Sequence, residues 1–204
     1  MKPAIDFWYS LGSTYTYLSA MRIEALAERH DVTVNWRVFS VRRIMQEMDN
    51  RFLAGKPEKY AHMWRDIARR AAMYGLPANV PVPHPIKEFE RAHLVATLGL
   101  REGWGIAFSR ASFRRWFVDG QEPGAEPSLT NSLREVGQDP DRVLSASADP
   151  AIAADLDAAT STARALGIFG SPSFVVDGEL FWGDDRLEDA VSWAKFGAVR
   201  RLIS

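Results

Sequence analysis

The chain has 204 residues, of which 47% are hydrophobic and 25% charged, so it can bury a core in one domain or in a domain with a large insertion. Its 25 basic and 26 acidic residues give a formal net charge of -1, which disfavours nucleic acid and anionic membrane surfaces as partners. It contains no cysteine, which excludes disulfides, thiolate metal sites and a dithiol redox centre of its own.

No stretch of the sequence approaches the roughly 20 apolar residues that a membrane-spanning helix needs. The first residues also lack the basic region and apolar run of a secretion signal. We therefore expect a soluble protein of the cytoplasm.

The first 40 residues predict a strand, a helix and a second strand. Residues 5–9 are rich in strand-forming side chains, and residues 10–13 interrupt them before a helical pattern that ends at residues 30–31. Residues 32–38 then alternate between apolar and polar side chains. A right-handed crossover would make the two strands parallel in one sheet, with the helix over one face.

From about residue 41 to residue 166 the pattern is helical, with breaks at glycines and prolines and no convincing strand. Residues 173–176 and 179–182 then predict a hairpin around Asp177 and Gly178, followed by a helix to about Lys195. This order indicates an α/β, thioredoxin-like domain formed by residues 1–40 and 165–204, with an all-helical insertion at 41–164.

Ser13 lies where the first strand meets the first helix. A serine there commonly caps the helix through its hydroxyl. The same helix end also offers free N–H groups and partial positive charge to an anion, at the position where thioredoxin-like proteins carry a reactive cysteine. A hydroxyl donor at this position would suit the thiolate of a bound molecule, so both interpretations stay open.

Two further candidates flank the hairpin. Pro172 either starts a strand in the ordinary way or forms a cis bond that turns the backbone of Ser171 toward an extended, peptide-like ligand. Asp185 is predicted to cap the last helix, with Glu188 as its capping-box partner. Asp184 has no such structural role, and adjacent carboxylates here could bind the free α-amino group of a ligand.

Other polar residues carry weaker signals. The four histidines show no metal-ligand spacing, so we expect no metal site, and His84 is interpreted as a loop residue. Trp104, Arg114, Arg115 and Trp116 could line an aromatic pocket for a carboxylate, but a solvated helix face with a buried Trp is the favoured interpretation.

Three segments taken together resemble a known family. Residues 13–18, 169–172 and 181–187, with a helical insertion between the first two, resemble the 2-hydroxychromene-2-carboxylate isomerases, which are relatives of the kappa-class glutathione transferases. The resemblance covers essentially the whole chain. It implies a DsbA-like thioredoxin fold, bound glutathione and a homodimer.

The resemblance also implies roles for individual residues. Ser13 would be catalytic and would stabilise the glutathione thiolate. Pro172 would be cis, and the main chain of Ser171 would pair with the cysteinyl part of glutathione. Asp184 and Asp185 would receive the γ-glutamyl end.

Asn50 and Lys59 match, in spacing, an Asn and a Lys that bind glutathione in the family. The sequence departs from the family at Thr14, where a proline is usual, and at Ser171, where an aliphatic residue is usual. Neither change removes one of the chemical groups named above.

The resemblance implies a glutathione-dependent isomerase that acts on 2-hydroxychromene-2-carboxylate or a related aromatic 2-oxo acid in aromatic catabolism. A kappa-type glutathione transferase or peroxidase is the alternative within enzymes. A non-catalytic, thioredoxin-like protein that binds peptides is the alternative outside them, and the absence of cysteine excludes a thiol–disulfide oxidoreductase.

Overall fold

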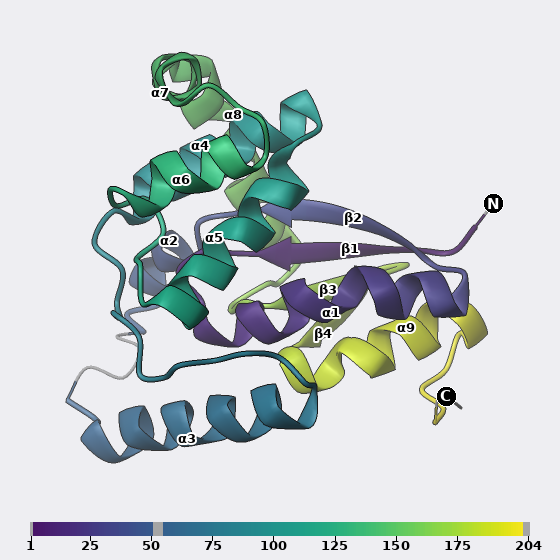
Figure 1. Cartoon of the computed structure of the whole chain (residues 1–204). Helices are drawn as coiled ribbons and strands as arrows, with labels where there is room; N and C mark the ends of the chain where they lie inside the picture. The colour runs from purple at the N-terminus through teal and green to yellow at the C-terminus, as the bar shows by residue number, and fades with distance from the viewer. Residues whose placement is uncertain (1, 51–54, 202–204) are drawn as a thin grey trace.

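The computed structural model describes residues 2–50 and 55–201 and has one mixed sheet with the strand order β2-β1-β3-β4 (Figure 1). β1 (Ala4–Tyr9) pairs in parallel with β2 (Thr33–Val38). β1 also pairs antiparallel with β3 (Ser173–Val176), which forms a hairpin with β4 (Glu179–Trp182). The predicted parallel pair and hairpin are both confirmed.

An aromatic row crosses the sheet and fixes its register. Phe7 lies opposite Trp36 on one side and opposite Phe174 on the other, and Phe174 lies opposite Phe181. The ring centres of Phe7 and Phe174 are 5.4 Å apart and stacked, and those of Phe7 and Trp36 are 4.8 Å apart at a steep angle. Such cross-strand pairs stabilise one register over its neighbours.

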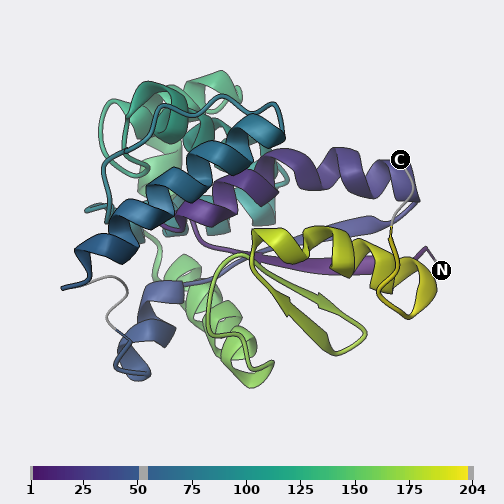
Figure 2. The ribbon, with the colours of Figure 1, turned by 90° about the horizontal axis from the view of Figure 1, so that it is seen from below.

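Helices cover both faces of the sheet. α1 (Thr14–His30) and α9 (Leu187–Phe196) lie side by side over one face, and α8 (Pro150–Ala165) lies against the other (Figure 2). Because both faces are covered, Ile5, Phe7, Trp8 and Tyr9 of the central strand β1 are all buried.

Between β2 and α8 the described residues form helices joined by loops and no strand, in line with the predicted helical character of this segment. Its helices are α2 (Val41–Glu47), α3 (Pro57–Met73), α4 (Phe89–Glu102), α5 (Gly105–Asp119), α6 (Ser128–Glu135) and α7 (Pro140–Ser147). α3 packs beside α1, while α4 contacts both β2 and α8. These contacts bring α3 and α4 to the end of the sheet where α1 begins (Figure 1).

The hairpin turn has the backbone that its sequence predicts. Asp177 and Gly178 both have positive φ, 49° and 88°, as the tight turn favoured by Asp-Gly requires. Across residues 2–50 and 55–201, none of the helices has the length and apolar character of a membrane span.

Candidate active site

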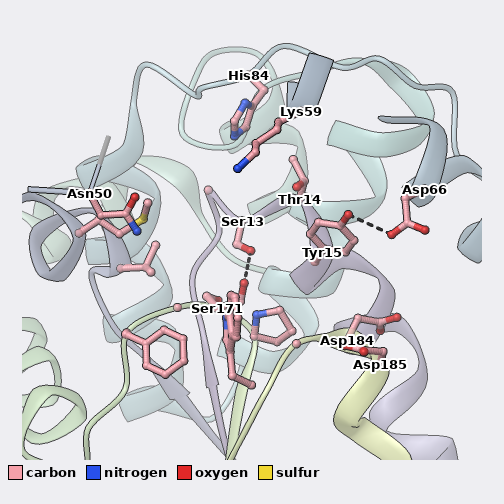
Figure 3. A pocket seen from close by; sticks show the side chains of 18 of the residues that line it. Ser13, Thr14, Tyr15, Asn50, Lys59, Asp66, His84, Ser171, Asp184 and Asp185 are labelled. Carbon is pink, nitrogen blue, oxygen red and sulfur yellow. Dashed lines mark hydrogen bonds between the residues drawn. The ribbon is translucent and has the colours of Figure 1, made fainter. Parts of the chain in front are cut away.

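A pocket of about 550 Å³ opens where the start of α1, the loop before β3 and the 3-10 helix η1 (Asp184–Arg186) meet (Figure 3). All the residues predicted from the sequence to bind or react line it, and they are Ser13, Asn50, Lys59, Ser171, Pro172, Asp184 and Asp185. The fold therefore gathers in one place groups that come from both ends of the chain.

Ser13 occupies the N-cap position of α1, but its side chain makes no capping bond. Its hydroxyl donates instead to the carbonyl oxygen of Ser171, at 2.6 Å (Figure 3). The interpretation of Ser13 as a side-chain cap is therefore wrong. Because its side chain leaves the first-turn N–H groups of α1 uncapped, the helix end keeps its positive character toward the pocket.

Ser171 joins the two loops that face each other across the pocket. Its bond to Pro172 is cis, as the sharper interpretation predicted. Its hydroxyl accepts from the backbone N–H of Ser10 at 3.0 Å and lies 2.8 Å from the hydroxyl of Thr16. These two partners give a structural reason for a polar side chain where the family usually has an aliphatic one.

His93 on α4 contacts the β1–α1 loop, which contains Ser10 and Leu11. Its Nδ1 donates to the carbonyl oxygen of Phe89 at 2.6 Å, so Nε2 is the acceptor for the N–H of Leu11 at 3.2 Å and a partner of the Ser10 hydroxyl at 2.8 Å. Burial lowers the pKa of His93 to about 4, which keeps the ring neutral near pH 7. The insertion thus anchors the loop that carries Ser13.

The structure contradicts the predicted capping role of Asp185 and the expectation that Asp184 has no structural role. Asp184 is only 1% exposed, and its Oδ1 accepts from Ser19 at 2.9 Å and from Arg22 at 3.0 Å. Burial raises the pKa of Asp184, and the ion pair with Arg22 opposes that rise. Asp185 instead forms an exposed ion pair with Arg186.

The predicted capping box is absent from the last helix. α9 begins at Leu187, and the residue at its N-cap position, Arg186, makes no side-chain cap. Glu188 pairs with Arg22 at 2.6 Å rather than with a backbone amide near Asp185. Asp184 is therefore the structural member of the acidic pair, and Asp185 is the accessible one.

One wall of the pocket consists of residues that sequence reasoning missed. Asp66 of α3 accepts, on Oδ2, from the Tyr15 hydroxyl at 3.0 Å and from Nε of Arg70 at 3.1 Å. Burial and the nearby carboxylate raise the pKa of Tyr15, so this hydroxyl remains a donor. The available signal was the spacing of Asp66 and Arg70, one helical turn apart on α3.

The opposite wall carries amines and a histidine. Lys56 and Lys59 line it with Asn50, and Figure 3 shows Lys59 and His84 on the far side of Ser13 from Ser171. His84 was interpreted only as a loop residue, yet it lines the pocket beside Trp64. Burial and the nearby Arg42 lower the pKa of His84 to about 4, so its ring is neutral near pH 7.

Two exposed aromatic side chains border the pocket. Phe169 and Trp182 are 40% and 52% exposed, and their ring centres lie 4.8 Å apart. Beside the polar groups, they offer an apolar surface to an aromatic molecule. Neither was assigned a role from the sequence.

The remaining candidates lie elsewhere. Arg114 and Arg115 both pair with Glu135, and Trp116 is buried, which confirms the interpretation as a helix face with a buried Trp. Within the described part of the chain, no cluster of three His, Asp or Glu side chains could hold a metal ion.

The fold and the site together define a thioredoxin-like protein in which a serine stands at the helix N-terminus opposite a cis-proline. The family model of the DSBA-like thioredoxin domain matches residues 4–192. The chain therefore belongs to the DSBA-like thioredoxin family, and the predicted fold is confirmed.

Similar proteins support the narrower resemblance. A 2-hydroxychromene-2-carboxylate isomerase of Sphingobium xenophagum is 27% identical over 92% of this chain and 96% of its own. An isomerase of the same name from Pseudomonas putida is 23% identical over 90% of both. A solved 2-hydroxychromene-2-carboxylate isomerase superposes with a TM-score of 0.79, at 22% identity over 90% of both chains.

Proposed function

We propose that this protein is a glutathione-dependent isomerase of 2-hydroxychromene-2-carboxylate or a related aromatic 2-oxo acid. The observation that carries the proposal is the placement of the Ser13 hydroxyl at the N-terminus of α1, facing the cis-Pro172 loop, in a chain without cysteine. The names of its relatives supply the reaction, because a fold alone does not determine one.

The groups around the pocket suit glutathione, which carries two carboxylates, one ammonium and a thiol. Lys56 and Lys59 line one part, and Asp66, Arg70 and Asp185 line another. The Ser13 hydroxyl and the start of α1 line the same pocket, with Lys59 on the far side of Ser13 from Ser171 (Figure 3), and would stabilise an anionic sulfur.

Glutathione would supply the thiolate whose reversible addition to a conjugated substrate permits rotation about a former double bond. The residues of the chain would orient the tripeptide, lower the pKa of its thiol and exclude water from its sulfur. Phe169 and Trp182 offer the second substrate an apolar surface beside the sulfur position.

Titration calorimetry of the purified protein with reduced glutathione and with S-methylglutathione tests the proposal. We expect both to bind, and we expect the glutathione-loaded protein to isomerise the chromene, followed by its absorbance. Conjugation of an electrophile without isomerisation would favour the kappa-type transferase instead. Absence of binding at millimolar glutathione would contradict the proposal and favour a peptide-binding module.

A further inference from the structure

The α3 wall of the pocket is a set of charged groups without an assigned role. Arg70 lies between two carboxylates, with Nε 3.1 Å from Oδ2 of Asp66 and Nη1 3.7 Å from Oδ2 of Asp184. Tyr15 donates to the same oxygen of Asp66. All four residues line the pocket.

The buried carboxylate of Asp184 explains why a cation lies at the position of Arg70. Its Oδ1 is used by Ser19 and Arg22, while its buried Oδ2 accepts no hydrogen bond of ordinary geometry among the described residues and lies near Tyr74 and Arg70. A buried carboxylate oxygen without a donor costs free energy, so a neighbouring cation stabilises it. Arg70 supplies that cation and stands between Asp184 and Asp66.

Arg70 has donors to spare for a ligand. Its side chain is 27% exposed, and a guanidinium has five N–H donors in a planar fork that matches a carboxylate. Fixing the fork between two carboxylates before binding lowers the entropy that a ligand contact costs.

Carboxylates suited to an ammonium lie beside this fork. Asp66 is 26% exposed, and both of its protein bonds end on Oδ2, so they leave Oδ1 unused. Asp185 presents a second, exposed carboxylate to the pocket. One cation next to two carboxylates is the pattern that complements an α-amino acid head group.

We propose that Arg70 binds the α-carboxylate of an amino-acid head group, and that Asp66 and Asp185 bind its α-ammonium. The inference rests on the proposed function, in which this head group is the γ-glutamyl end of glutathione. It adds two residues of α3 to that subsite. It also makes Asp184 a support for Arg22 and Arg70 rather than a direct ligand contact.

Two glutathione analogues separate the two halves of the head group. A 4-aminobutyryl group in place of γ-glutamyl removes only the α-carboxylate, and a glutaryl group removes only the α-amine. Calorimetry would compare glutathione with both analogues for the wild type, Arg70→Met and Asp66→Asn. Arg69→Met, which removes an exposed cation from the adjacent position of α3, is the matched control.

The wild type and Arg69→Met are expected to prefer glutathione over the 4-aminobutyryl analogue by about tenfold or more, the size of a charge-assisted pair. Arg70→Met should lose that preference. Asp66→Asn should lose much of the preference over the glutaryl analogue. Each preference is the ratio of two affinities measured on the same variant. A general loss of stability would lower both affinities and would not produce this result.

A preference for glutathione that survives Arg70→Met, or a wild type that binds glutathione and the 4-aminobutyryl analogue equally, would overturn the inference alone. A wild type that binds no glutathione would overturn the proposed function, and this inference with it. The titration of the wild type with glutathione therefore distinguishes the two failures.

Discussion

Ser13 illustrates how one side chain can be misassigned when only its neighbours in sequence are known. Its position leaves a helix cap and a donor to a bound thiolate both open, yet its hydroxyl donates to Ser171, which lies 158 residues further along the chain. The N-terminus of α1 thus keeps its own donors for an anion, while the proton of the Ser13 hydroxyl is engaged with the Ser171 carbonyl.

Replacing Ser13 by Ala tests that arrangement. We expect the thiol pKa of bound glutathione, read from thiolate absorbance near 240 nm, to rise by about one to two pH units toward its free value, because one hydrogen bond to the thiolate is lost. Affinity for S-methylglutathione should change little. The control is Thr14→Val, which removes a neighbouring hydroxyl bonded to Met63; an equal rise in that variant would contradict a specific role for Ser13.

The acidic pair shows where residue-level prediction stops. Asp184 and Asp185 are adjacent, and nothing local distinguishes the buried carboxylate from the exposed one. The distinction comes from Ser19 and Arg22 of α1, which only the fold brings to Asp184. Asp66 and Arg70 were missed because pairs one helical turn apart are common on exposed helices.

At the scale of elements, two loops from opposite ends of the chain are joined by the Ser171 hydroxyl. Its partners, Ser10 and Thr16, flank Ser13 in the β1–α1 segment, and both are fully buried. The spacing between the serine and the cis-proline loop is therefore set by hydrogen bonds between side chain and backbone as well as by sheet pairing.

Ser171→Ala should lower the free energy of unfolding by about 1–3 kcal/mol, because it leaves the N–H of Ser10 and the hydroxyl of Thr16 buried without this partner. Urea unfolding measures the change. The same substitution should cost less in a Thr16→Val background, since one of the two orphaned groups is then absent. Ser145→Ala, an exposed serine of α7, is the control and should stay within about 0.5 kcal/mol of wild type.

Elements specified by local pattern were predicted well. The parallel β1–α1–β2 unit and the Asp177–Gly178 hairpin follow from strand alternation, a helical stretch and turn chemistry. The start of the last helix was predicted incorrectly, because the 3-10 helix η1 precedes α9. Asp184 lies in η1 and accepts a hydrogen bond from Arg22 instead of beginning an α-helix. Local capping signals could not reveal a partner that lies more than 160 residues away.

At the scale of the whole molecule, the insertion and the sheet share the candidate active site. α4 reaches the β1–α1 loop through His93, and α3 forms a wall of the pocket. The order of the elements indicated an inserted helical segment, but its packing depends on contacts between distant residues that periodicity does not specify.

The buried His93 predicts a pH dependence of folding. Its pKa is lowered to about 4 in the folded protein, against about 6.5 when unfolded, so between these values the unfolded chain binds the extra proton. Stability should therefore fall as the pH falls from 7 to 4, with on the order of 3 kcal/mol of the loss due to this residue.

Urea unfolding at a series of pH values measures that loss. His93→Gln should flatten the slope between pH 7 and pH 4, and His62→Gln, which removes an exposed histidine of α3, should leave the wild-type slope. A slope unchanged by His93→Gln would show that the ring is not held neutral by the fold.

The hydrogen bond from Ser13 to Ser171 affects how the Ser13 hydroxyl can donate to a bound anion. A hydroxyl has a single proton, and in this structure that proton is committed to the Ser171 carbonyl. Turning to a sulfur leaves that carbonyl without this donor, a loss that the amide N–H of an extended ligand in the cis-proline groove would offset. Occupying the groove and releasing the serine proton would then be one event, so a bare thiol without a peptide amide would enter the same pocket and find the donor still engaged.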